Sequence, residues 1–311
     1  MKLNIRLLTA YILSTCVLLT ACSNNNQVEN QGDLYLSFTV TQKQGNEQNM
    51  YIYTYDLNTE EIVNRDVLIY NSQYPLAVYS FHENSIYFSS RDEEKCDQLH
   101  VKDLNQNKDK TLTNTLFAIN YIIPVNNKLY LAAVEKGTRA VGFFEICDDK
   151  LVRVLANKDC FVWKIYVDLD DNSMLLNTYS QSELDKNMES NDSSITIGKN
   201  TIKKFCLNDN SIDDMFVTGE GYITNIGLDY DNSIYFQQGN FYKVEKGKEN
   251  LYPELNSLEI KDLIYMSDNY IYYISNNGTI NKYNRCTKES IVIYSLEESD
   301  SAINNAIVLS K

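Results

Sequence analysis

Acidic side chains gather at two places in the chain where their oxygens could bind a calcium ion. Asp168, Asp170 and Asp171 precede one expected strand, and Asp229 and Asp231 precede another. Ca²⁺ takes about six to eight oxygen ligands, often from closely spaced carboxylates. However, the EF-hand pattern is incomplete, because the glycine at its sixth position and the glutamate at its twelfth are missing. Asp is also favoured in tight turns for backbone reasons, so we interpret both groups as turns and expect no bound metal.

The residues that usually carry catalysis are scarce. His82 lies in an expected turn and His100 in an expected strand, and neither has a nucleophile at a matching position of the chain's internal repeat. No G-x-S-x-G, H-E-x-x-H or phosphate-binding glycine loop occurs. A pair of carboxylates that cleaves glycosides stays an open alternative, because 42 acidic residues allow many chance pairs. We therefore expect a protein that is not an enzyme and needs no cofactor.

Five internal cysteines follow no metal-binding or redox pattern. Their number is odd, their spacing is wide and no C-x-x-C occurs, which argues against both a zinc site and a disulfide scaffold. We expect these residues to be free thiols: Cys96, Cys147, Cys160, Cys206 and Cys286.

One further cysteine, Cys22, has a different setting. A basic start is followed by an uncharged apolar run, 7–21, which ends in Leu-Thr-Ala-Cys and continues as Ser-Asn-Asn-Asn. The run is shorter than the roughly 20 residues that span a membrane and fits the apolar region of a secretory signal. The pattern resembles the bacterial lipoprotein signal, in which a Leu-x-Ala-Cys box is cut before the Cys and that thiol carries a diacylglyceryl group. The resemblance implies a signal peptide at 1–21, a lipid-anchored Cys22 at the extracytoplasmic face of the cell membrane, and a flexible tether at 22–31. An ordinary signal peptide or an uncleaved anchor are the alternatives.

The composition restricts the class of protein. Lys and Arg total 28 against 42 Asp and Glu, which gives a net charge of −14. A chain this acidic repels phosphate backbones, so we expect no nucleic-acid partner. Hydrophobic residues make up 43%, as in globular domains, and the 24 tyrosines favour strands.

Short strands separated by turn residues recur along the chain. A turn of Asp, Asn or Gly followed by an apolar–Tyr–apolar strand occurs in six copies: 32–40, 83–90, 126–134, 171–180, 231–239 and 268–278. Another strand and a polar turn follow each copy, and a further apolar strand precedes most of them. No long stretch of the sequence has the apolar periodicity of a helix. Four short strands repeating every 40–60 residues are typical of the blades of a β-propeller. We therefore predict an all-β propeller domain over 32–311.

The two ends of the domain predict how the ring closes. The N-terminal unit has three strands and lacks the first, whereas the C-terminus has one strand without a blade of its own, Ile303–Leu309. We predict that this strand pairs beside Leu34–Val40 and completes a ring of six blades, which leaves no open sheet end. A two-domain β-sandwich is the alternative fold.

The repeated phrases also resemble a known family. NSIYF at 84–88 and 232–236, and YIYYIS at 270–275, stand where six-bladed propellers of the low-density-lipoprotein-receptor type carry their Tyr-Trp-Thr-Asp strand. The chain is similar as well to bacterial, largely clostridial-type lipoproteins. The resemblance implies a six-bladed propeller that binds a partner, and no catalytic residue carries over from it.

Binding residues are expected on one rim of the ring. The connections between strands 2 and 3 and between blades share this rim, which we call the loop rim, and the 1–2 and 3–4 turns share the opposite turn rim. Tyr74, Phe117, Trp163 and Tyr222 stand near the starts of first strands. They are expected to line a central pocket, where they could stack on a sugar or hold a peptide, or else to pack between blades. A long polar connection at 178–200 lengthens the third blade, as a partner-binding loop or as a flexible decoration.

These features together predict a function. We expect a membrane-anchored extracytoplasmic propeller that acts as a non-catalytic binding or scaffold module, with a protein, peptide or glycan partner. One alternative is a lipoprotein that captures or senses a solute or carbohydrate. The other is an enzyme, such as a lyase or glycosidase, that uses the central cleft.

Overall fold

The computed structural model describes residues 33–44, 47–189, 198–296 and 300–311. The predicted signal peptide at 1–21, the tether at 22–31 and Cys22 lie outside these residues. Asp33–Lys311 forms a compact unit of its own. Within the described ranges, no helix combines the length and the apolar composition that crossing a membrane requires.

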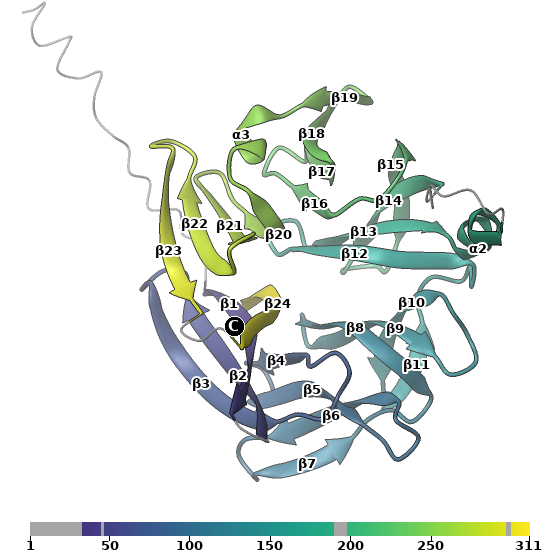
Figure 1. Cartoon of the computed structure of the whole chain (residues 1–311), viewed down its shortest axis with the longest axis vertical. Coiled ribbons are helices and arrows are strands. Elements are labelled where there is room, and N and C mark those ends of the chain that lie inside the picture. The colour runs from purple at the N-terminus through teal and green to yellow at the C-terminus, as the bar shows by residue number, and fades with distance from the viewer. Residues whose placement is uncertain (1–32, 45–46, 190–197, 297–299) are drawn as a thin grey trace, which may run out of the picture. The chain divides into compact units, whose positions relative to one another are not determined.

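Six antiparallel four-stranded sheets, the blades, are arranged around a common axis (Figure 1). From its innermost to its outermost strand, blade 1 contains β24 (Ser301–Ser310), β1 (Leu34–Gln44), β2 (Glu47–Asp56) and β3 (Glu61–Ile69). In the same order, blade 2 contains β4 (Ala77–Ser80), β5 (Ser85–Arg91), β6 (Asp97–Asp103) and β7 (Lys108–Thr111). Blade 3 contains β8 (Leu116–Val125), β9 (Lys128–Glu135), β10 (Val141–Cys147) and β11 (Lys150–Arg153).

The remaining three blades follow the same plan. Blade 4 contains β12 (Cys160–Asp168), β13 (Ser173–Ser180), β14 (Lys199–Cys206) and β15 (Ile212–Glu220). Blade 5 contains β16 (Asn225–Leu228), β17 (Ile234–Gln238), β18 (Asn240–Glu245) and β19 (Lys248–Leu251). Blade 6 contains β20 (Ile260–Met266), β21 (Tyr270–Ser275), β22 (Thr279–Asn284) and β23 (Glu289–Ser295).

The turns explain why Asn and Asp recur between the strands. Asn84, Asn126, Asn172 and Asn232 occupy equivalent turns after the innermost strand, and all four have positive φ. Among residues other than glycine, Asn and Asp tolerate this left-handed conformation best. In the turn after β2, the side chain of Asp56 accepts backbone N–H bonds from the next residues, at 2.8 and 3.1 Å. Local turn chemistry therefore sets the repeat.

The ring closes as the two ends of the sequence predict. β24 is the innermost strand of blade 1 and pairs antiparallel with β1, with Leu36 opposite Val308 and Phe38 opposite Ala306. Val308 and Leu309 are buried. The prediction of six blades closed by the C-terminal strand is confirmed.

The core lies between the blades. Tyr130 and Phe143 of blade 3 pack against Phe205 of blade 4, with ring centroids 5.4 Å from Phe205 in both cases. Because each sheet is covered on both faces, its central strands are apolar on both faces. Blades 6 and 1 are joined in the same way, by Tyr294 against Phe38 at 5.0 Å.

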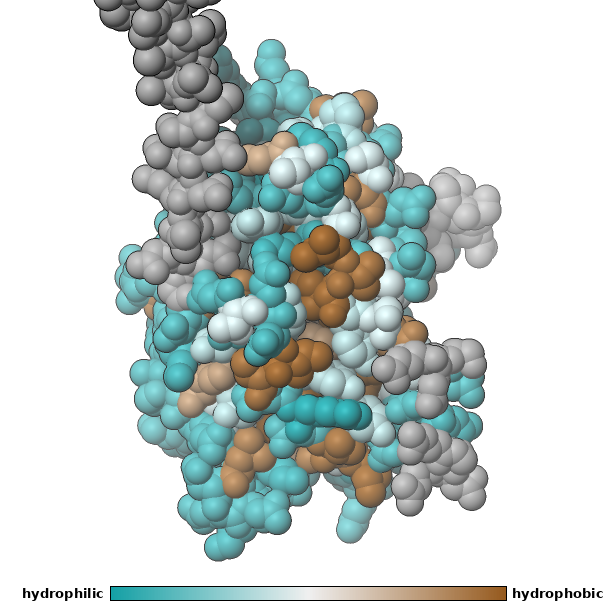
Figure 2. All heavy atoms as spheres, turned by 90° about the vertical axis from the view of Figure 1, so that its left-hand side faces the viewer, coloured by the Kyte–Doolittle hydropathy of each residue, from teal (hydrophilic) through white to brown (hydrophobic). Residues whose placement is uncertain are grey.

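The outermost strands are the exposed edges of the sheets. Every residue of β7 and β19 is exposed. On β3 and β23 several apolar side chains also face water, among them Ile69 and Val292. Figure 2 shows that apolar patches on this side of the propeller are separated by polar side chains.

Two short helices depart from the all-strand expectation. The 178–200 connection forms a helix, α2 (Gln181–Glu189), and it belongs to blade 4, not to the third blade as predicted. No side chain of α2 is buried, so no apolar periodicity marked it in the sequence. Asp159 holds its start, because its carboxylate accepts the N–H of Ser182 at 2.7 Å. α3 (Pro253–Asn256) is a single turn between blades 5 and 6.

Candidate functional site

The four aromatic residues predicted as a binding site lie at the loop rim and are exposed. Each precedes or begins the innermost strand of its blade, in blades 2 to 5. Their exposures are 52% for Tyr74, 53% for Phe117, 37% for Trp163 and 44% for Tyr222. Side chains this exposed keep much of their surface in contact with solvent. Their role in binding a ligand remains a prediction.

Two of the four side chains come together. Trp163 lies 6.0 Å from Tyr222, centroid to centroid, and 6.2 Å from Phe161, which in turn stacks on Tyr179 at 4.7 Å. These four rings form one row across blades 4 and 5. Phe161 and Tyr179 were not predicted, because their contact depends on the pairing of β12 with β13. Tyr74 belongs neither to this row nor to the pocket at the centre of the ring.

That central pocket has a volume of about 270 Å³ and occupies the axis of the ring. Its walls come from four innermost strands, β8, β12, β20 and β24, which converge at the centre of Figure 1. Of the four predicted residues, Trp163 lines this axial pocket, whereas Tyr74, Phe117 and Tyr222 do not. The expectation of a central pocket is therefore met, but with mostly different residues.

The charged residues of the axial pocket neutralise each other. The ammonium of Lys164 lies 3.1 Å from a carboxylate oxygen of Asp262, on the opposite wall. Burial alone would lower the pKa of Lys164, but the Asp262 carboxylate and the Tyr121 hydroxyl outweigh it and raise that pKa above its usual range. Burial raises the pKa of Tyr121. Lys164 therefore stays charged, and the phenol of Tyr121 stays protonated, at any ordinary pH.

A glycine in blade 5, Gly227, allows the two strands that carry this ion pair to approach each other. Gly227 of β16 lies under β20, where a Cβ would stand 2.7 Å from Cδ2 of Leu263 and 3.1 Å from Sδ of Met266. Tyr166 of β12 reaches over β16, since its hydroxyl accepts the N–H of Met266 at 2.8 Å. Glycine thus lets β12 and β20 approach each other, and Lys164 and Asp262 belong to these two strands.

The acidic residues considered for calcium face separate partners. Asp168 accepts the backbone N–H groups of Asp170 and Asp171 at 3.0 and 3.3 Å. Asp170 accepts the hydroxyl of Tyr265 at 2.7 Å. Asp171 forms an ion pair with Lys204. The three carboxylates therefore shape a turn and its contacts, as the interpretation as turns requires.

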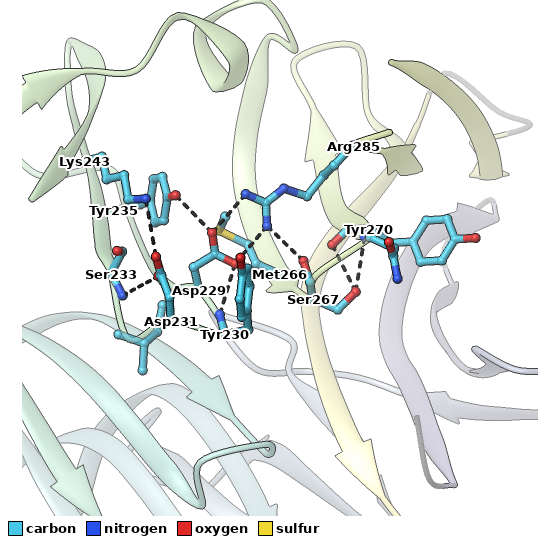
Figure 3. A network of polar contacts seen from close by, with 12 residues as sticks. Asp229, Tyr230, Asp231, Ser233, Tyr235, Lys243, Met266, Ser267, Tyr270 and Arg285 are labelled. Atoms are coloured by element: carbon cyan, nitrogen blue, oxygen red, sulfur yellow. Dashed lines mark hydrogen bonds and ion pairs between the residues drawn. The ribbon is translucent and has the colours of Figure 1, made fainter. Parts of the chain in front are cut away.

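The second acidic pair joins two blades (Figure 3). Asp229, at the end of β16, accepts two parallel N–H bonds from Arg285 of blade 6, at 2.8 and 2.9 Å. The hydroxyl of Tyr235 donates to the same carboxylate at 3.0 Å, and Arg285 also donates to the carbonyl of Ser267. Asp231 accepts the N–H of Ser233 and faces away from this pair. The guanidinium of Arg285 therefore neutralises Asp229.

Among the described residues, one group has ligand atoms close enough for a metal: Asp92, Glu94 and Cys96, within 4.8 Å of one another. The ammonium of Lys136 lies 3.2 Å from Asp92 and 2.7 Å from Glu94. A cation is thus already held between the two carboxylates. This cluster is explained as an ion-pair network of blades 2 and 3.

The histidines and cysteines have the settings that their sequence context predicts. His82 is exposed in a turn, and His100 stacks on Phe88 at 5.4 Å. Burial lowers the pKa of His100. The five described cysteines are free thiols, with Cys96 and Cys160 buried and Cys147 exposed.

A larger hollow of about 780 Å³ opens on the turn rim, between blades 2 and 3 and the end of β24. Its charged side chains are largely solvated, and Lys110 and Asp149, each 58% exposed, pair with each other across the two blades. Exposed pairs of this kind contribute little energy. We therefore regard the axial pocket as the candidate site.

Comparisons with known proteins support the fold. TolB from Acinetobacter baumannii matches with a TM-score of 0.52 at 11% identity, over 89% of this chain and 67% of that chain. The tricorn protease matches with a TM-score of 0.50 at 12% identity, over 84% of this chain. This chain spans only 26% of the tricorn protease chain. A scan against protein families and a search of curated proteins found no match. At these identities the likeness shows the fold alone.

Proposed function

We propose that the chain is an extracytoplasmic lipoprotein, anchored to the cell membrane through Cys22, whose propeller binds a partner and does not catalyse a reaction. The exposed aromatic side chains of the loop rim, Tyr74, Phe117, Trp163 and Tyr222, are the observation that supports binding. Aromatic residues are enriched at binding interfaces, because they bury a large apolar area at a small cost in conformational entropy.

The topology suits an anchored binding protein. The chain enters the propeller at Leu34, which pairs with Ser310 at the turn rim. The aromatic side chains lie at the opposite rim. The chain therefore enters the propeller at the rim opposite to the aromatic side chains.

Metabolic labelling with alkyne-tagged palmitate tests the anchor. The full chain should incorporate the label and sediment with membranes, whereas Cys22→Ala should do neither. Cys16→Ala is the matched control, because this cysteine lies within the apolar run and should leave labelling unchanged. A Cys22→Ala chain that still carries the label would contradict the anchor.

Photo-cross-linking in intact cells tests the binding surface. Tyr222 and Tyr230 flank β16 in the same blade on opposite rims, with exposures of 44% and 66%. A photoreactive amino acid at position 222 should give a defined adduct, and the same group at position 230 should not. Trp163→Ala should remove the adduct. Equal adducts from both positions would refute a binding role of the loop rim.

One observation favours a second function, the capture of a small solute. Trp163 belongs both to the aromatic row and to the wall of the axial pocket. A solute in that pocket would contact the same side chain that a macromolecular partner would cover at the rim.

A further inference from the structure

Three β-bulges give the axial pocket its chemistry. At Asn120 of β8, Trp163 of β12 and Asn304 of β24 an extra residue interrupts the pairing with the neighbouring strand. β8 has a second interruption at Phe117, and β20 has two, at Lys261 and Ile264. In a regular strand successive side chains point to opposite faces, but a bulge can turn two of them to one side. Asn120, Trp163 and Asn304 each line the pocket together with the residue that follows: Tyr121, Lys164 and Asn305. The bulges therefore bring polar side chains of three strands to the wall of the pocket.

The polar groups of the pocket include unused hydrogen-bonding capacity. Nδ2 of Asn304 donates to Thr41 at 2.7 Å, and Nδ2 of Asn305 donates to the carbonyl of Ala77 at 3.4 Å. The amide oxygens of both side chains, and the whole amide of Asn120, have no partner among the described residues. These groups offer three acceptors and the donor of one amide to whatever occupies the pocket.

The ion pair determines which charge the ligand carries. The pocket is lined by one cation and one anion, Lys164 and Asp262, which already neutralise each other at 3.1 Å. A charged ligand would have to separate them and leave one charge unpaired, which is unfavourable in a partly enclosed site. A hydroxyl group can instead accept a hydrogen bond from Lys164 and donate one to Asp262 while the pair stays intact.

We propose that the axial pocket binds a neutral, hydroxyl-rich ligand of the size of a single pyranose ring, stacked on Trp163. The inference rests on the proposed binding function and names the class of ligand. The volume of about 270 Å³ would hold roughly nine water molecules at about 30 Å³ each. The indole provides an apolar surface for the C–H face of the ring, and Asn120, Asn304 and Asn305 bond its hydroxyls.

The fluorescence of Trp163, the single tryptophan of the chain, reports on the pocket without a label. The propeller unit, residues 33–311, is titrated with D-glucose, D-galactose, D-mannose and N-acetyl-D-glucosamine. The charged comparators are L-alanine, which is a zwitterion, and L-glutamate and inorganic phosphate, which are anions. At least one neutral sugar should give a saturable change with a dissociation constant in the micromolar to millimolar range, and the comparators should give none.

Variants of the wall separate binding from folding. Asn120→Ala should weaken sugar binding at least about threefold, and Asp262→Asn at least about tenfold, as the loss of hydrogen bonds to neutral and charged groups predicts. Asp262→Asn also leaves Lys164 without its anion, so it should now prefer D-glucuronate to D-glucose. Tyr230→Ala is the matched control, because this exposed aromatic residue lies on the turn rim, outside the pocket wall, and should leave the constant unchanged. The preference for glucuronate is a result that simple misfolding cannot produce.

Two results would overturn the inference. One is a saturable response to the charged comparators alone, and the other is no response to any sugar at concentrations well above millimolar. Neither result would touch the proposed function, which the labelling of Cys22 and the loop-rim adduct in cells test separately. Loss of sugar binding in Tyr230→Ala as well as in Asn120→Ala would also refute the axial site.

Discussion

Two aspartates at equivalent points of neighbouring blades should respond in opposite ways to the same substitution. Asp168 ends β12 and Asp229 follows β16, and both side chains are buried, at 7% and 3% exposure. Asp229 is paired with Arg285, whereas Asp168 accepts only backbone N–H groups. We expect Asp168→Asn to stabilise the protein at neutral pH and Asp229→Asn to destabilise it.

The magnitude for Asp168 follows from its pKa. Burial raises that pKa from 3.8 to about 6; the N–H groups of Asp171 and Asp170 partly offset the effect of burial, and their carboxylates add to it. The unfolded chain therefore loses this proton near pH 4 and the folded chain near pH 6, so ionisation of Asp168 destabilises the fold as the pH rises through this window. A shift of about two pH units corresponds to at most about 3 kcal/mol. We expect Asp168→Asn to raise the free energy of unfolding by about 1–3 kcal/mol at pH 7. The hydrogen bonds of the turn are kept, because the Asn oxygen still accepts its N–H groups.

Urea unfolding of residues 33–311 between pH 4 and pH 8 measures both effects. The free energy of unfolding of Asp168→Asn should equal that of the natural protein at about pH 4. The difference between the two should then rise between about pH 4 and pH 6 and stay constant above about pH 6. Asp229→Asn should lose about 3–5 kcal/mol at pH 7, because it leaves the Arg285 guanidinium with an uncompensated charge. A loss of stability in Asp168→Asn at pH 7, or a gain that does not depend on pH, would refute the reasoning.

Three further results are expected from the fold. Leu309→Ala, in the closing strand β24 at 3% exposure, should lower the free energy of unfolding by about 2–5 kcal/mol in urea titrations; a loss below about 1 kcal/mol would show that β24 contributes little to closure. Gly227→Ala should cost about 1–3 kcal/mol in the same assay because its Cβ meets Leu263, whereas Gly219→Ala, with nothing within 4 Å, should change stability by less than about 0.5 kcal/mol. In thiol titration of the native propeller, the exposed Cys147 and Cys286 should react at once and the buried Cys96 and Cys160 only after unfolding; fewer than two reactive thiols would contradict the free-thiol assignment.

The sequence predicted the parts of the fold that local chemistry sets. Asn84 and Asn232 precede equivalent strands because Asn tolerates the left-handed turn conformation, and this recurrence made the blades countable. The strand at Ile303–Leu309 had no blade of its own, and the unit that begins at Leu34 lacked its first strand. The two were therefore predicted to pair. The helix α2 was missed, because a helix without a buried face leaves no apolar periodicity.

The candidate site was predicted only in part. The repeat reveals where the innermost strands start. Trp163 and Tyr222 stand near two of these starts, so their place at the loop rim could be predicted. The ion pair in the axial pocket could not be predicted from the sequence, because Lys164 and Asp262 are 98 residues apart and belong to different blades.

The sequence alone thus determined the strands, the number of blades and the closure of the ring, because turns and strand alternation depend on neighbouring residues. The tertiary structure decided which side chains line the axis. A single extra residue at Asn120, Trp163 or Asn304 shifts the pairing register and turns adjacent side chains into the pocket. Register is a property of two strands together, so neither strand's sequence specifies it.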